Sequence, residues 1–160
     1  MGEPRGESSR RLLPLLLGAA VVAAALGFFW ELRAAQRLPE GPVPVVWDKE
    51  ACASCKMHIG QPEFAAQLQL ADGQVLDFDD PGCLFTWLSE HEDPVHAIWF
   101  HHHHEERWLS QDDVGFVTVA PTPMGYGLGA VDRSTPGAKS FEQVREEFRR
   151  NRGGREGAGQ

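Results

Sequence analysis

The residues best suited to chemistry lie together in the short stretch ACASCKMHIG, residues 51–60. It holds Cys52, Cys55, Met57 and His58, in a chain with only three cysteines and three methionines. Thiolate, thioether and imidazole groups are ligands for soft and borderline metal ions, and two closely spaced cysteines are also typical of redox pairs. The stretch therefore predicts a redox pair, a structural zinc site or a site for a softer metal.

The surrounding sequence argues against the first two of these. A thioredoxin-like pair opens a long amphipathic helix, but Gly60 and Pro62 follow this pair and prevent one. A structural zinc site usually needs four Cys or His ligands. The third cysteine, Cys83, lies in a predicted apolar helix, where a free cysteine behaves as a small hydrophobe.

A softer metal suits the residues that are left. Cys55 and Met57 are two residues apart, so an extended segment would project both side chains from one face. A thiolate beside a thioether suits Cu(I). His58 would lie on the other face, and Cys52 could join if the loop curls. A loop disulfide between Cys52 and Cys55, with Met57 filling a gap in the core, remains the alternative.

The elements that must position these residues come next in the chain. Residues 63–80 predict two short strands joined by a turn at Asp72 and Gly73. Residues 79–91 predict a helix with Asp80 as its N-cap and Pro81 at its first position. This is one ββα unit.

A second unit follows, less regularly. Residues 94–100 predict a strand, residues 101–107, which include the histidine run, a turn, and residues 108–109 and 114–120 further strand material. The segment SFEQVREEFRR predicts a closing helix with a capping box of Ser140 and Gln143. We therefore expect an α+β fold of two small ββα units packed together, preceded by one N-terminal transmembrane helix.

The N-terminal segment is apolar enough for a membrane anchor. Residues 12–30 contain no charge, and arginines precede them, so the chain start (residues 1–11) is expected in the cytoplasm. A cleavable signal peptide is the alternative. Residues 31–44 are expected to be a linker, residues 45–150 the folded domain and residues 151–160 a disordered tail.

The charge of the chain limits its partners. Residues 39–160 hold ten lysines and arginines against twenty aspartates and glutamates. Nucleic acid is bound through clustered basic side chains, so a nucleic-acid partner is not expected. An acidic body is mildly favourable to a cationic ligand or a basic partner.

Three segments, taken in order, resemble the NosL family, the accessory copper chaperones of nitrous oxide reductase. They are WDKEACASCKMHI, DFDDPGCLFTWL and TPMGYGLGAVDR. The resemblance implies a non-enzymatic, exported Cu(I) carrier with Cys55 and Met57 as ligands and Cys52 in a less certain role. It also implies nitrous oxide reductase as copper acceptor and a membrane transporter complex as partner. Family members are typically lipoproteins, whereas this chain has no cysteine in a lipidation position; a single-pass inner-membrane protein with a periplasmic domain is expected instead.

Two further sets of candidate ligands remain open. His101, His102, His103 and His104 could provide a third copper ligand or a docking site for Cu²⁺ or Zn²⁺, or they could form a solvated polar turn. Met124, among glycines that predict a sharply turning backbone, could line the copper site or simply pack. The competing functions are a membrane-tethered thiol–disulfide protein and a metal storage or sensing module.

Overall fold

The computed structural model describes residues 18, 20–30 and 38–157, the last six of these by their backbone alone. The chain divides into two units, 1–37 and 38–160. In the first unit residues 20–30 are helical. The predicted cytoplasmic start (1–11), residues 12–17 and 19 of the predicted anchor (12–30) and residues 31–37 of the predicted linker lie outside the described residues. Within the described part of the chain, no helix is both long and apolar enough to cross a membrane.

The second unit begins with a four-stranded antiparallel sheet in the order β2-β1-β3-β4. Its strands are β1 (Ala66–Leu70), β2 (Val75–Phe78), β3 (Val95–His101) and β4 (Trp108–Ser110). The predicted hairpin between β1 and β2 is confirmed. Gly73 has φ +93°, a conformation that glycine adopts without strain, and Asp72 accepts a hydrogen bond from the Gln74 amide.

All five residues of β1 are buried, because both faces of the sheet are covered there. One face packs on helix α2 (Pro81–Glu90) and the core. On the other face, the buried side chains of Gln67 and Gln69 bond the backbone of the incoming chain: the Gln67 amide nitrogen donates to the Val43 carbonyl at 2.9 Å and that of Gln69 to the Gly41 carbonyl at 2.7 Å. These bonds satisfy backbone carbonyl groups of an irregular segment that is not part of the sheet.

The second sheet has the order β6-β5-β7 and contains β5 (Val114–Thr118), β6 (Leu128–Asp132) and β7 (Lys139–Ser140). Helix α3 (Phe141–Gly157) follows directly. Its predicted capping box is confirmed, since Gln143 Oε1 accepts from the Ser140 amide and Ser140 Oγ from the Gln143 amide. The helix includes residues 151–157, which belong to the segment predicted as a disordered tail.

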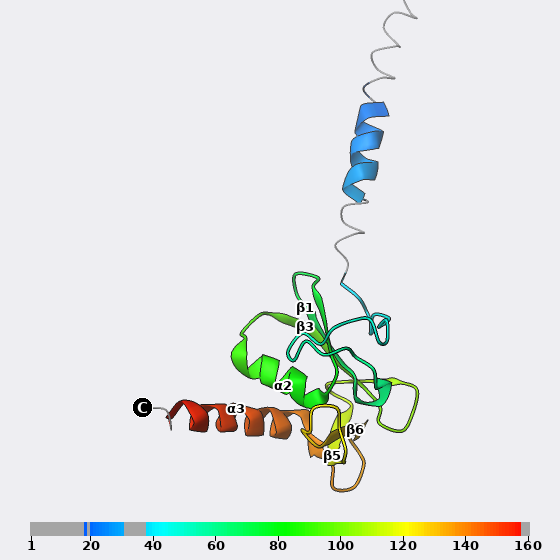
Figure 1. Cartoon of the computed structure of the whole chain (residues 1–160). Helices are drawn as coiled ribbons and strands as arrows, with labels where there is room; N and C mark the ends of the chain where they lie inside the picture. The colour runs from blue at the N-terminus through cyan, green and yellow to red at the C-terminus, as the bar shows by residue number, and fades with distance from the viewer. Residues whose placement is uncertain (1–17, 19, 31–37, 158–160) are drawn as a thin grey trace, which may run out of the picture. The chain divides into compact units, whose positions relative to one another are not determined.

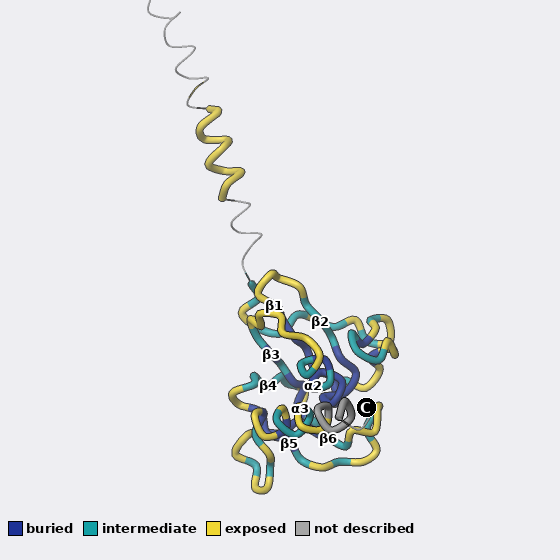
Figure 2. Tube along the Cα trace, turned by 90° about the vertical axis from the view of Figure 1, so that its left-hand side faces the viewer, coloured by how far each residue is buried: buried dark blue, intermediate teal, exposed yellow. Residues whose placement is uncertain are grey.

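The two sheets and two helices meet at one aromatic core. Phe85 of α2 lies 5.8 Å from Phe100 of β3, 5.3 Å from Phe116 of β5 and 5.4 Å from Phe148 of α3, measured between ring centroids. Figure 1 shows the two helices side by side, and Figure 2 shows the buried parts of the tube in dark blue. Aromatic clusters of this kind fix how elements pack.

The predicted division into two ββα units is only partly right. The chain is α+β with two antiparallel sheets, but β3 and β4, which were expected in the second unit, belong to the first sheet. β3 pairs with β1 through five residue pairs, Leu68 opposite Ile98 among them. β1 lies between β2 and β3, so both of its edges are paired, and its residues are buried on both faces of the sheet.

Candidate metal centre

The cysteine motif forms a compact loop, residues 51–58. An isolated β-bridge between Ala51 and His58 closes the loop at its base. Inside it, the Cys52 amide donates to the Met57 carbonyl at 2.8 Å and the Lys56 amide donates to the Cys52 carbonyl at 3.0 Å. Lys56 has φ +65°, a left-handed conformation that reverses the chain. We call these residues the cysteine loop.

The loop is attached to the outer edge of the first sheet. The Ala53 amide donates to the Asp77 carbonyl of β2 at 2.8 Å. Further along, Gly60 donates to the Asp79 carboxylate at 3.4 Å, between β2 and α2. The loop is thereby fixed beside the point where β2 passes into α2.

Helix α2 begins at that same point. Asp80 is its N-cap and accepts from the Gly82 amide at 2.8 Å, and Pro81 is its first residue, both as predicted. Cys83 is the third residue, in the first turn, and its amide donates to the Asp80 carbonyl. The positive end of the helix dipole favours a thiolate in the first turn.

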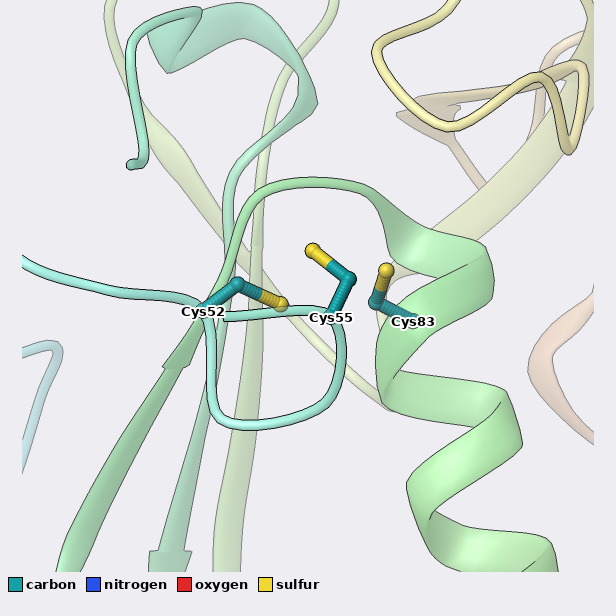
Figure 3. Close-up of side chains that lie close together, drawn as sticks. All are labelled: Cys52, Cys55 and Cys83. Carbon is teal, nitrogen blue, oxygen red and sulfur yellow. The ribbon is translucent and has the colours of Figure 1, made fainter. Parts of the chain in front are cut away.

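The sulfur atoms of Cys52, Cys55 and Cys83 all lie within 4.8 Å of one another. Figure 3 shows the two loop cysteines and the helix cysteine pointing toward a common space. Cys52 and Cys83 are buried, at 0% and 1% exposure, whereas Cys55 is partly exposed. Cys83 is buried in the core, as expected of a small hydrophobe, but the sequence did not predict that its thiol lies beside the two loop sulfurs.

The three thiols differ in acidity. A hydrogen bond from the Cys83 thiol is the main reason why the pKa of Cys52 is lowered to about 5. Backbone amides of the loop and of Asp79 also lower this pKa, whereas burial acts in the opposite direction. That same hydrogen bond raises the pKa of Cys83. Burial raises the pKa of Cys55, against a bond from the Met57 backbone. Near neutral pH the cluster therefore holds one thiolate and two thiols that a bound metal would deprotonate.

The spacing of the sulfurs suits a single soft ion. A metal with bonds of about 2.3 Å to thiolate sulfur holds its thiolates about 4 Å apart. Sulfurs within 4.8 Å reach that spacing through small side-chain movements. Among the described residues, no carboxylate joins the three sulfurs within 4.8 Å. Three thiolate donors select soft ions such as Cu(I) over Mg²⁺ or Ca²⁺.

The two other predicted ligands of the motif lie at its outer end. The segment is not extended as expected, because Cys55 is in a turn and Lys56 is left-handed, so the argument that placed Cys55 and Met57 on one face does not hold. Met57 is 59% exposed, with its backbone next to the Cys55 sulfur. His58 is also exposed and pairs with Ala51 through its backbone. Their role as ligands stays a prediction.

Met124 lies near the helix end of the cluster. Its amide donates to the second Asp80 carboxylate oxygen at 3.1 Å, and its side chain is 40% exposed. The predicted sharp turning is confirmed by Gly125 and Gly127, both at φ +73°. The segment 121–127 is thereby held against the first turn of α2, close in space to Cys83's backbone.

The histidine run is not the exposed turn that the sequence allowed. His101 ends β3 and His102 follows it, and both are buried at 6% and 5% exposure. The amide of His103 donates to the Ala130 carbonyl of β6 at 2.7 Å, which ties the two sheets together. Only His104 is exposed. Among the described residues, no histidine joins the three thiols within 4.8 Å.

One histidine has acidic neighbours of its own. Ligand atoms of His102, Glu105 and Asp132 lie within 4.8 Å of one another. However, Arg107 bonds both carboxylates, through Nε to Glu105 and through Nη2 to Asp132 at 2.6 Å. These bonds lower the pKa of both acids. The guanidinium thus already compensates the charges that would attract a cation.

The structure places three thiols that could hold a metal ion together on a two-sheet α+β scaffold. The model of the NosL family matches residues 42–151. The chain therefore belongs to the NosL family, as its motifs predicted.

A solved structure supports the fold. The crystal structure of the copper chaperone NosL from Shewanella denitrificans matches with a TM-score of 0.50 at 18% identity, over 69% of this chain and 87% of that chain. At this identity the match speaks for the fold alone. No curated protein matches the chain.

Proposed function

We propose that the chain is a Cu(I) carrier that receives copper at Cys52, Cys55 and Cys83 and passes it to a copper-accepting protein. The observation that supports this is the convergence of three thiols within 4.8 Å, two of them buried and one partly exposed. Membership of the NosL family and the copper chaperone among its structural neighbours agree with this function. No catalytic turnover is required of it.

The unequal burial of the ligands suggests how copper would leave. Cys52 and Cys83 hold the ion from the protein side, while Cys55 stands toward solvent. A ligand of the acceptor enters beside Cys55 and displaces that thiolate first, so the ion is never without donors. Met57, 59% exposed on the same loop, is the additional ligand that we propose for the open side, as the family resemblance implies. His58 and Met124 are weaker candidates there.

We further propose nitrous oxide reductase as the acceptor and a membrane transporter complex as a working partner, on the basis of family membership. The uncharged residues 12–30 support an inner-membrane anchor with the folded unit on the periplasmic side. A test of anchoring is fractionation of the full chain: retention in the membrane after a high-salt and carbonate wash is expected, and release would contradict it.

A thiol–disulfide function is the alternative, since the same sulfurs lie close enough to react. It needs an exposed nucleophilic thiolate. In this structure the cysteine with the lowered pKa, Cys52, is fully buried, and the pKa of the accessible Cys55 is raised. This arrangement is the reverse of what attack on another protein's disulfide requires, so it favours metal binding.

The test is an anaerobic Cu(I) competition titration of the reduced full chain against a chromophoric chelator. The expected result is one tightly held Cu(I) per chain, with a smaller loss of affinity for Met57→Leu than for any Cys→Ser variant. Ser54→Ala is the matched control within the same loop and should behave like the parent. If the parent does not compete, while Cys52 and Cys55 cycle readily with a dithiol, the redox function replaces this proposal.

Delivery must be separated from storage. Copper-loaded protein is mixed with a copper-free acceptor, with nitrous oxide reductase as the first choice. Transfer faster than the release of Cu(I) into buffer supports delivery. Transfer no faster than that release supports a storage or sensing module.

A further inference from the structure

Beside the cysteine loop lies an open groove of about 900 Å³. Its walls come from the loop, from the β1–β2 hairpin and from the C-terminal end of α2 with the residues that follow. We call it the β2 groove, because β2 is the outer strand of the first sheet and faces it. Nothing in the metal site described above uses this space.

The groove is strongly acidic. Five acidic residues line it against a single lysine, Lys56, whose ammonium group bonds the Ala53 carbonyl at 2.6 Å. A concave surface of one sign of charge concentrates ligands of the opposite sign. The acidic residues are Glu50, Asp72, Asp77, Glu90 and Asp93.

One of these carboxylates, that of Glu50, has an oxygen without a hydrogen-bond partner among the described residues. Glu50 Oε2 is buried and unpaired in the described part of the chain. It lies near Asp77, whose pKa is raised to about 6, chiefly by burial and further by the Glu50 charge. Two adjacent carboxylates, one of them with an unsatisfied oxygen, are more stable with a cation or hydrogen-bond donor between or beside them.

The backbone of β2 offers hydrogen bonds to the same space. Leu70 donates to the Gln74 carbonyl, so the alternation of an antiparallel ladder turns the N–H and C=O groups of Val75 and Asp77 to the outer edge. The Asp77 carbonyl is taken by Ala53 of the cysteine loop. No described residue pairs with the outward groups of Val75. An edge strand with free groups is a template for another strand.

One side of the groove is formed by two stacked rings. Trp87 is buried, and the exposed ring of His91 stacks on it at 4.2 Å with an interplanar angle of 4°. The flat face of His91 beside carboxylates can pack against the aliphatic stem of a lysine or arginine whose cationic head reaches the acids.

From these observations we propose that the β2 groove binds an extended, lysine- or arginine-bearing segment of a partner protein, which adds to β2 as a further strand. Backbone pairing with Val75 provides the register, and the carboxylates select the basic side chains. Ala53, Ser54 and Lys56 belong both to the groove wall and to the cysteine loop. The bound partner therefore lies beside the thiols, and in this respect the inference rests on the proposed function.

The probe is an N-acetylated, dye-labelled heptapeptide of alternating lysine and threonine, titrated into the metal-free full chain at low salt and followed by fluorescence anisotropy. We expect saturable binding that weakens as salt is added. Two matched peptides separate the contributions: one with glutamate in place of lysine, which should not bind, and one with alternate amides N-methylated, which should bind at least tenfold more weakly. Equal binding of the N-methylated peptide would overturn strand addition.

Protein variants locate the site. Glu90→Gln with Asp93→Asn removes two exposed charges of the groove and should weaken the lysine peptide about tenfold. Asp112→Asn with Glu142→Gln, outside the groove lining, makes the same change of net charge and should leave affinity unchanged. Val75→Pro removes the outward donor at an edge position that tolerates proline and should also weaken binding. Equal losses in the two double variants would overturn the groove as the site.

The Cu(I) titration of the parent, run alongside, keeps the two proposals apart. If the peptide does not bind while one Cu(I) does, the groove proposal fails and the copper function stands. If the peptide binds but Cu(I) does not, the copper function fails and the groove remains a docking site for a basic segment.

Discussion

The structure brings side chains that could bind a metal together in two places. The two clusters differ in the hydrogen bonds and ion pairs that these side chains already make. In the cysteine cluster three sulfurs lie within 4.8 Å of one another, and Cys52 is hydrogen-bonded by the Cys83 thiol and by backbone amides, with no basic side chain among these partners. In the cluster of His102, Glu105 and Asp132 the spacing is the same, but Arg107 bonds both acids. Proximity of suitable atoms is therefore not sufficient for a metal site; the charges must also be uncompensated.

The most direct way to break this contrast is to remove one sulfur. Cys83→Ser should lower the Cu(I) affinity about a hundredfold, because the shorter, harder hydroxyl replaces one of three soft donors. The measurement is the anaerobic competition titration. His102→Gln in the other cluster is the matched control and should change the affinity less than twofold. An unchanged affinity in Cys83→Ser would remove the helix cysteine from the site.

The next prediction concerns the segment that covers the helix end of the cluster. A methyl group at Gly82 would clash with Cγ of Tyr126, so the Tyr126 ring requires glycine there. Gly82→Ala should lower the free energy of unfolding by about 2 kcal/mol in urea denaturation. Gly41→Ala, where nothing lies within 4 Å, is the control. If both variants lose the same free energy of unfolding, the close approach of Tyr126 does not explain the need for glycine at position 82.

The contrast between the two clusters can also be tested by removing the guanidinium group that binds the acids of the second cluster. Arg107→Gln frees the carboxylates of Glu105 and Asp132 next to the buried His102. In a background with Cys52, Cys55 and Cys83 replaced by serine, Zn²⁺ affinity should then rise at least tenfold over that of the same background with Arg107 intact, as measured by calorimetry, because the cation that occupied the site is gone. No gain over the parent would mean that spacing, and not the guanidinium, limits this cluster.

The smallest effect is expected at Asp77, which anchors the cysteine loop through its carbonyl. Its pKa is raised by burial and by Glu50 to about 6, above the ordinary 3.8. The folded state therefore binds more protons than the unfolded state between these values, and stability falls as pH rises through about 4 to 6. In Asp77→Asn, which can still accept from Gln67, this fall should be smaller by about 1 kcal/mol.

The measurement for Asp77 is the difference in unfolding free energy between parent and variant at pH 4, 5, 6 and 7. Working with the difference cancels other titrating groups, such as Asp79 and Asp80, whose pKa values are also raised. A difference that does not change with pH would show that Asp77 has its ordinary pKa in the folded chain.

Local sequence signals predicted the elements that carry the site. The Asp72–Gly73 turn, the Asp80–Pro81 helix start and the capping box of Ser140 and Gln143 are all present, since each depends on interactions over two to four residues. The family motifs likewise located the cysteine loop.

The parts that the sequence did not predict depend on distant contacts. Cys83 follows Cys55 by 28 positions in the chain and lies on an apolar helix, so its pattern is the same as that of a core residue. Its place in the first helical turn, where the dipole favours a thiolate, is the signal that could have identified it. Strand β6, within a glycine-rich segment, and the burial of His101 and His102 depend on how the two sheets meet.

The cysteine loop is closed on itself by the Ala51–His58 bridge and joins β2 through the Ala53 amide. Its sulfurs face a third one on a separate element, the helix α2. An ion shared by loop and helix is therefore a removable cross-link, and its binding energy adds to the stability of the folded chain. A copper acceptor that removes the ion would therefore also remove the link between loop and helix.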